Sequence, residues 1–275
     1  MNLGKIFKRR ESNIRGQKGN FVLGTMPKLE NSKIVFKGNG NVFFCEDGVE
    51  ICNSQIFFHG DNSLIYLAKN RHPYKLNVGI HNNSNLNFGG DTYINQTLYL
   101  ILSEEKNIFI GKGCLVSINV KFRNADPHLI YDAENGERLN DSKSIYIGDH
   151  IWIGENVYIL KNTQIASGSI IGANTVLSGK KVFSNTVWAG NPCKEVKSHI
   201  FWEGSCVHSW TNAKTEKFRR NTTNDYIYSE CLDERLLFED IEKSLNETKS
   251  ALERLTLLQE INHKKQKNRF YNPWK

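Results

Sequence analysis

Residues 147–190 read IGDHIWIGENVYILKNTQIASGSIIGANTVLSGKKVFSNTVWAG, and this stretch decides the fold. A bulky apolar residue, or alanine once, stands at every sixth position: Ile147, Ile153, Ile159, Ile165, Ile171, Leu177, Phe183 and Ala189. The residue four places later is small or β-branched in most repeats: Ile151, Val157, Thr163, Ser169, Thr175 and Val187. A period of six is neither helical nor a simple strand alternation, and it indicates a short strand followed by a tight corner.

Three such units make one triangular coil, with the large residue inside and the small residue at the corner. Glycine follows four of the large residues and tolerates backbone geometry that a Cβ would strain: Gly148, Gly154, Gly172 and Gly190. Each coil is stable only against its neighbours, so several must stack. We therefore predict an all-β chain folded as a left-handed parallel β-helix of hexapeptide repeats.

The same register continues upstream with two breaks, and strand-like runs precede it. The upstream register positions are Phe88, Ile94, Leu100, Ile110, Val116 and Phe122, and the earlier runs cover 34–36, 42–44, 56–58 and 64–67. We expect an N-terminal segment at 1–33, the β-helix at 34–198 and an extension at 199–275. The extension should be mainly helical from about residue 233, because apolar residues recur there at three- and four-residue steps: Leu237, Ile241, Leu245, Thr248, Leu252 and Leu255. Such a helix would pack on the prism or associate with its copies.

A polar, turn-rich loop at 124–144 interrupts the repeat, because Phe122 and Ile147 are 25 residues apart instead of 24. Loops of this length in compact domains are often functional. We therefore expect the active site at this loop.

Composition limits the cellular location and the kinds of binding partner that we expect for the protein. The 275 residues carry a net charge of +7, and no apolar run approaches the roughly 20 residues of a membrane span. Six cysteines show neither zinc-site pairs nor the density of a disulfide scaffold, so we expect reduced thiols and a cytoplasmic location. With no nucleic-acid motif, the positive charge favours a phosphate-bearing cofactor or an acidic sugar polymer.

Two aromatic side chains are candidates for chemistry. His128 lies in the loop, where imidazole is a natural general base near neutral pH, and Asp126 or Asp132 could orient it. A solvent-facing histidine is the alternative. Trp152 points outward, because Ile153 points into the prism, and it could contact a ligand, another subunit or both.

The segment RNADPHLIYDAENGERLNDSKSIYIGDHIWIGENVYILK, residues 123–161, resembles the hexapeptide-repeat acetyltransferases. It is most similar to the bacterial capsule polysialic acid O-acetyltransferases. In those enzymes a loop histidine and a tryptophan 24 residues later form the catalytic pair, and His128 and Trp152 match both in type and spacing. The stretches 170–177 and 189–194 resemble the family's CoA-binding coils.

The resemblance implies direct transfer from acetyl-CoA in a ternary complex, without an acyl-enzyme or a metal. His128 would act as the base and Trp152 would hold the reacting groups. Residues at the cofactor would be of two kinds, small ones that let pantetheine approach the backbone and lysines that meet phosphates: Gly154, Gly172, Ala173, Ser178, Ala189, Gly190, Pro192, Lys180, Lys181, Lys194 and Lys197. Bulkier residues stand near Ser178 and Gly179 in the family, so the wall at the adenine end differs here.

The family also implies a homotrimer with active sites between subunits, and an acceptor that is a sialic-acid-containing or related acidic polysaccharide. Arg138 could grip an acceptor carboxylate, as could Arg123 at the start of the loop, although a salt bridge within the loop is equally open for Arg138. Peripheral association with the capsule machinery fits the expected absence of a membrane span.

Three other functions stay open. An N-acetyltransferase acting on an amino sugar nucleotide would share the fold. A zinc site for carbon dioxide hydration would draw on His81, His128 and His150, whose spacing argues against it. A non-enzymatic β-helix for assembly would need no catalytic histidine.

Overall fold

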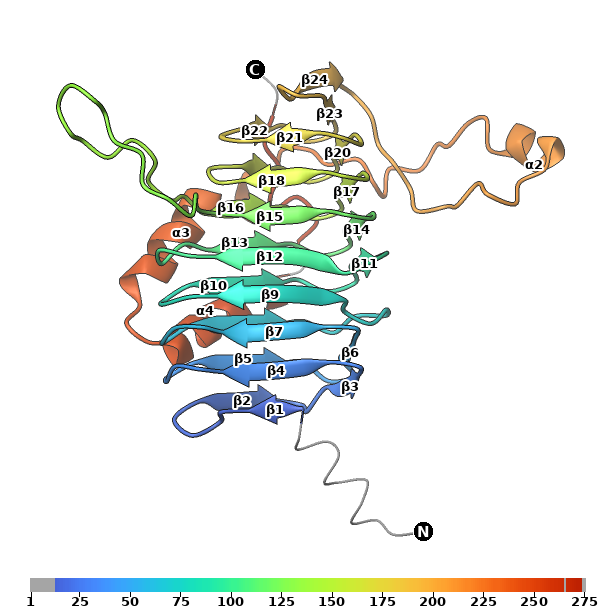
Figure 1. The fold of residues 1–275 in the computed structure, drawn as a ribbon. Helices are drawn as coiled ribbons and strands as arrows, with labels where there is room; N and C mark the ends of the chain where they lie inside the picture. The colour runs from blue at the N-terminus through green and yellow to red at the C-terminus, as the bar shows by residue number, and fades with distance from the viewer. Residues whose placement is uncertain (1–12, 265, 274–275) are drawn as a thin grey trace, which may run out of the picture.

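The computed structural model describes residues 13–264 and 266–273, which form a left-handed parallel β-helix flanked by helices (Figure 1). Three stacks of strands make the faces of the prism, and β24 (Lys194–Lys197) closes face 3 by pairing antiparallel to its last strand. Face 1 contains β1 (Ile14–Arg15), β4 (Lys33–Phe36), β7 (Gln55–Phe58), β9 (Leu76–Ile80), β12 (Leu98–Leu102), β15 (Lys121–Arg123), β18 (Tyr158–Leu160) and β21 (Val176–Leu177). Face 2 contains β2 (Phe21–Gly24), β5 (Val42–Cys45), β8 (Leu64–Leu67), β10 (Asn85–Phe88), β13 (Ile108–Ile110), β16 (Ile145–Ile147), β19 (Gln164–Ile165) and β22 (Lys181–Val182). Face 3 contains β11 (Tyr93–Ile94), β14 (Leu115–Val116), β17 (Trp152–Ile153), β20 (Ile170–Ile171) and β23 (Val187–Ala189).

The core of the prism follows the hexapeptide register. The predicted inward positions from Ile147 to Leu177 are fully buried, and so are Thr163 and Ser169 at the corners. The upstream positions Phe88 to Phe122 are buried as well, which confirms the slipped register there. Local periodicity therefore predicted most of this core.

The last coil departs from the predicted register by one residue. Val182 pairs with Ile165 and Trp188 pairs with Ile171, so these two residues take the inward positions assigned to Phe183 and Ala189. The turn after Leu177 is one residue shorter than the others and contains Gly179 with a φ of +63°. Because one residue is missing, every later side chain shifts by one position.

The β-helix begins earlier than residue 34. Strand β1 pairs with β4 and β2 pairs with β5, while β3 (Lys28–Glu30) pairs with β6 (Glu50–Cys52). Coils in this half advance by 22 residues, as Ile34, Ile56 and Val78 show by pairing in register. Longer corners hide the six-residue period, so only the strand-like runs were visible. Residues 1–12 of the predicted N-terminal segment lie outside the described residues.

The extension is helical but holds no single long helix. It contains α2 (Asn212–Lys217), the 3-10 helix η1 (Leu232–Glu234), α3 (Phe238–Glu247) and α4 (Ala251–His263). The expected helix breaks where Thr248 adopts an extended backbone, and the Ser250 hydroxyl then caps α4 by accepting the N–H of Glu253. After the break Leu252 faces solvent, and Leu255 and Leu258 are buried.

Helices α3 and α4 pack on face 2 of the prism (Figure 1). Outward-facing strand residues such as Phe44 and Tyr66 form a second apolar core with Ile241, Leu245 and Leu258. Burial of each large side chain contributes about 1.5–3 kcal/mol, so this face belongs to the folded unit. Of the helices in the described residues, none has the length and apolar character to cross a membrane.

Candidate active site

The loop at 124–144 leaves the prism at the corner between faces 1 and 2, beyond α3 (Figure 1). Its base is fixed by Asn124, whose side-chain oxygen accepts the N–H of Ser103 at 2.9 Å and whose carbonyl accepts the N–H of Lys143. Further out, the two limbs pair as Leu139 donates its N–H to the Ile130 carbonyl at 2.9 Å. The loop is therefore an ordered hairpin.

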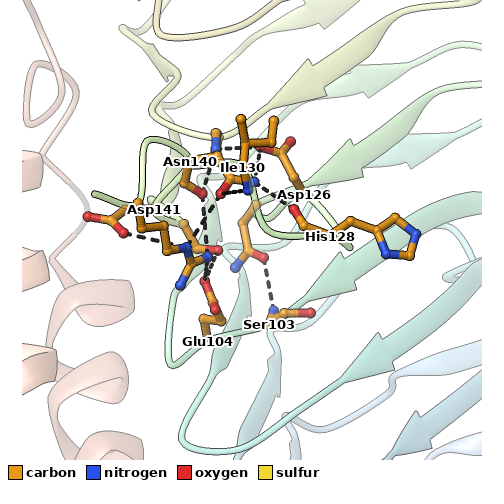
Figure 2. Close-up of polar contacts among 11 residues, drawn as sticks. Ser103, Glu104, Asp126, His128, Ile130, Asn140 and Asp141 are labelled. Carbon is orange, nitrogen blue, oxygen red and sulfur yellow. Dashed lines mark hydrogen bonds and ion pairs between the residues drawn. The ribbon is translucent and has the colours of Figure 1, made fainter. Parts of the chain in front are cut away.

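Asn140 is the centre of this hairpin (Figure 2). Its amide Nδ2 donates to the His128 carbonyl at 2.7 Å and to Asp126 Oδ2 at 3.1 Å, and its Oδ1 accepts the N–H of Ile130 at 2.9 Å. The side chain is only 5% exposed. One buried amide thus holds the backbone at His128 and Ile130 and the carboxylate of Asp126.

The two carboxylates proposed to orient His128 have other partners. Asp126 accepts from Lys161 Nζ at 2.6 Å, and this bond is the main reason that its pKa is lowered. Asp132 accepts the backbone N–H groups of Glu134 and Asn135 at the hairpin tip. Neither carboxylate is hydrogen-bonded to the imidazole in the described residues, and a role for either in orienting it stays a prediction.

The imidazole of His128 points away from the polar contacts that hold its backbone (Figure 2). The side chain is exposed, and it makes no hydrogen bond to any residue within 13–264 or 266–273. Two hydrogen bonds thus hold the backbone next to a ring that stays open to another molecule, and imidazole is a side chain that can act as a general base near neutral pH.

Trp152 lies on β17 in face 3 and is 41% exposed, as the register predicted. The loop with His128 emerges at the corner between faces 1 and 2 instead (Figure 1). The catalytic pair that the family resemblance implies is therefore not formed within one chain, and its formation between chains stays a prediction. The two residues belong to different edges of the prism.

The small residues assigned to the cofactor form a column at the corner after face 3. A Cβ on Gly154 would lie 2.7 Å from the Ala173 nitrogen, and one on Gly172 would lie 2.9 Å from the Ala189 Cβ. Stacking of coils alone thus requires glycine at both positions. Ala173 and Ser178 are exposed on the same end of the prism, and Gly190 has a φ of +96°.

The lysines assigned to CoA phosphates surround the last coil. Lys194 and Lys197 are exposed on β24, whereas Lys181 forms an ion pair of 3.2 Å with Glu239 of α3. Lys180 is half-buried, and Pro192 follows a cis peptide bond in the turn before β24. Their contact with a cofactor stays a prediction.

Arg138 already has a partner in the chain. Its guanidinium donates to Glu104 Oε2 at 2.9 Å, and this bond, together with one from Ser142, lowers the pKa of Glu104 to about 2. The salt-bridge alternative for Arg138 is thus observed, and acceptor binding by Arg138 stays a prediction. Arg123, half-buried on β15, lies at the root of the loop.

Sequence patterns did not identify Asn140, Lys161 or Trp202, which lies next to Trp152, as residues that support the site. Asn140 bonds to His128 across a hairpin, and Lys161, which follows directly after β18, bonds to Asp126 at a distance of 35 positions in the sequence. A buried asparagine in a polar loop has no signature of its own. Only the pairing of the limbs gives it a role.

The histidines of the zinc alternative lie in three separate places. His81 stacks on His59 with ring centroids 4.9 Å apart, His150 stacks on Trp202, and His128 is on the loop. In the described part of the chain, no three His, Cys, Asp or Glu side chains converge as a ligand set.

Comparison with known proteins identifies the family to which this fold belongs. Residues 144–179 match the model of the bacterial transferase hexapeptide family, which spans six repeats. A polysialic acid O-acetyltransferase from Neisseria meningitidis is 32% identical over 187 residues, which cover 68% of this chain and 86% of that protein.

Two solved structures have the same architecture. The polysialic acid O-acetyltransferase OatWY superposes with a TM-score of 0.66 at 29% identity, covering 74% of this chain and 96% of that one. The polySia-specific acetyltransferase NeuO gives 0.60 at 29% identity, covering 75% and 94%. Sequence and fold agree, so this chain is an acyltransferase that belongs to the family of hexapeptide-repeat polysialic acid O-acetyltransferases.

Proposed function

We propose that the protein transfers an acetyl group from acetyl-CoA to a hydroxyl of a sialic-acid-containing capsular or surface polysaccharide. The relatives' named acceptor, polysialic acid, is a polyanion, and the net charge of +7 on this chain favours such an acceptor and the CoA phosphates. A cytoplasmic reaction in peripheral association with the capsule machinery would give the enzyme both substrates.

His128 is the general base of the proposed reaction. Its imidazole takes the proton of the sugar hydroxyl as the oxygen attacks the thioester carbonyl, the C–S bond breaks, and the same proton passes to the departing sulfur. No acyl-enzyme forms. A positioned base contributes about 10²- to 10⁴-fold to the rate.

The observation that carries the proposal is the separation of His128 and Trp152 on one chain. His128 on the projecting hairpin of one copy and Trp152 on face 3 of another copy can act together when copies of the chain associate. The hairpin also exposes Leu129, Ile130, Tyr131 and Leu139 by more than half, as a segment that contacts another copy would. We therefore propose a homotrimer in which each site combines His128 of one copy with Trp152 of the next.

The first experiment incubates the purified protein with acetyl-CoA and either polysialic acid or an amino sugar nucleotide. Mass spectrometry should show one acetyl group per modified sialic acid, in an alkali-labile ester. An alkali-stable amide on the amino sugar would instead support the N-acetyltransferase. His128→Ala should lose about 10²- to 10⁴-fold in rate with CoA binding kept, whereas a non-enzymatic β-helix predicts no transfer by either protein.

The second experiment tests the shared site by complementation. His128→Ala and Trp152→Ala chains are each expected to be inactive, but coexpressed as mixed trimers they should regain activity. Each mixed trimer keeps one intact site of three, so a random 1:1 mixture should reach about one quarter of wild-type activity. Activity no higher than that of the single variants would show that both residues act within one chain.

A further inference from the structure

Trp202, at the start of the C-terminal extension, packs against the coil that carries Trp152. Its indole stacks on the ring of His150 with centroids 3.9 Å apart and planes 6° apart. Trp202 Nε1 donates to the His150 carbonyl at 3.2 Å, and His150 Nε2 lies 2.9 Å from the Trp202 carbonyl. Trp202 is therefore a residue with 8% exposure that is hydrogen-bonded once through its indole and once through its backbone carbonyl.

The extension is anchored on both sides of this contact. Ile200 donates its N–H to the Asn185 carbonyl at 3.0 Å, and the chain returns after α2 so that Tyr228 exchanges two hydrogen bonds with Asn185. Tyr226 stacks on His150 at 4.9 Å. The segment that presents Trp202 is therefore held where it leaves the prism and where it comes back.

The corner beneath His150 is held by a buried ion pair. Arg269 donates to both oxygens of Asp149, at 2.7 and 2.8 Å, and both side chains are 1% exposed. Asp149 also accepts the N–H of Lys112 at 2.7 Å. This brings the end of the chain against the residue that precedes His150, so the platform under Trp202 is rigid.

In the part of the chain that the structure describes, Trp152 forms hydrogen bonds through its backbone and not through its indole. Its N–H bonds to the Ser169 carbonyl at 3.0 Å in the strand register, and its indole faces outward from the coil. Within the described residues, Trp202 is the ring that the Trp152 indole meets, at a centroid distance of 6.0 Å and an angle of 50°. The outward indole therefore has a ring of the extension beside it, in addition to its strand neighbours Leu115 and Ile170.

We propose that Trp202 is a positioning residue that sets the orientation of the Trp152 indole for acyl transfer. The proposal rests on the function proposed above, since it gives Trp152 a part in the reaction. It assigns the extension a direct influence on the active site. A misplacement of about 1 Å in a reacting group lowers a rate by about 10²-fold, so the orientation matters kinetically.

The test compares Trp202→Phe, Trp202→Leu and Trp210→Ala in the full-length protein. Trp210 is the matched control because its ring contacts that of Phe218 instead, at a centroid distance of 4.7 Å, in the projecting part of the extension. We expect Trp202→Leu to lower kcat by about 10- to 100-fold with little change in KM for either substrate. Trp202→Phe, which keeps the stack on His150, should recover most of the rate, and Trp210→Ala should match the wild type.

Circular dichroism supplies a second readout. The two indoles at 6.0 Å should give an exciton couplet that disappears in Trp202→Leu and in Trp152→Ala and persists in Trp210→Ala. A folded Trp202→Leu protein without the couplet but with wild-type kcat would overturn the proposal. If Trp202→Leu does not fold, Trp202→Met takes its place, and a folded Trp202→Met protein with wild-type kcat would overturn the proposal. An active wild type with an impaired Trp152→Ala variant keeps the proposed function in either case, whereas absence of transfer by the wild type rejects that function first.

Discussion

The side-chain amide of Asn140 donates a hydrogen bond to the carbonyl of His128 over 2.7 Å, and it does so from a buried position. The bond joins two limbs of one hairpin, 12 positions apart in the sequence. The position of the proposed base therefore depends on Asn140, which takes no part in the proposed reaction itself.

Replacement of Asn140 should therefore impair the reaction without removing a reacting group. We expect Asn140→Ala to lower kcat by about 10²-fold, because the loop around His128 loses two hydrogen bonds to its backbone and one to the Asp126 carboxylate. Asn140→Asp should be equally slow, since a carboxylate cannot donate to the His128 carbonyl. Steady-state kinetics with polysialic acid measures this, with Asn135→Ala at the hairpin tip as control. Equal rates for Asn140→Ala and Asn135→Ala would contradict the prediction.

Variants of Arg138 and Glu104 can distinguish two roles of Arg138, stabilising the loop and binding an acceptor carboxylate. If the ion pair braces the loop, Arg138→Ala and Glu104→Ala should lower kcat by similar factors, about 3- to 10-fold for a half-exposed pair. If Arg138 grips an acceptor carboxylate, only Arg138→Ala should raise the acceptor KM. Measurement of kcat and KM for both variants distinguishes these roles, and we expect the matched loss.

His150 should make the stability of the protein depend on pH. Burial lowers its pKa, against the opposing effects of the Trp202 and Gly113 carbonyls and of Asp149. Its contribution to stability is therefore complete above the unfolded value of about 6.5 and is lost as pH falls from there toward the lowered pKa. Unfolding temperatures from pH 7.5 to 5 should fall more steeply for the wild type than for His150→Phe. Because burial also lowers the pKa of His59 and His81, some dependence should persist in the variant.

The buried pair of Arg269 and Asp149 should be costly to break. Arg269→Met leaves Asp149 buried and unpaired, and such a loss costs about 3–5 kcal/mol. The double variant Asp149→Asn with Arg269→Met should be more stable than Arg269→Met alone, because no uncompensated charge remains. Denaturant unfolding at fixed protein concentration tests this, and a double variant less stable than the single one would reject the explanation.

The hexapeptide period was sufficient to predict the prism and most of its inner residues. Ile147 to Leu177 repeat at a fixed local spacing, and stacking of coils needs only that spacing. The loop was visible for the same reason, as an interruption of the period, and with it the candidate His128. The register shift at Val182 and the helix break at Thr248 were not predicted, because each depends on how the chain pairs or packs beyond the local pattern.

Sequence by itself thus determined the coil, the loop and the residue types that could carry acyl transfer. Only the tertiary structure decided that His128 and Trp152 occupy different edges, that Asn140 holds the first and that Trp202 lies against the second. The ion pair behind Trp202 joins residues 120 positions apart. Such contacts are set by how distant segments meet on a folded surface, and a repeat specifies the surface but not what docks on it.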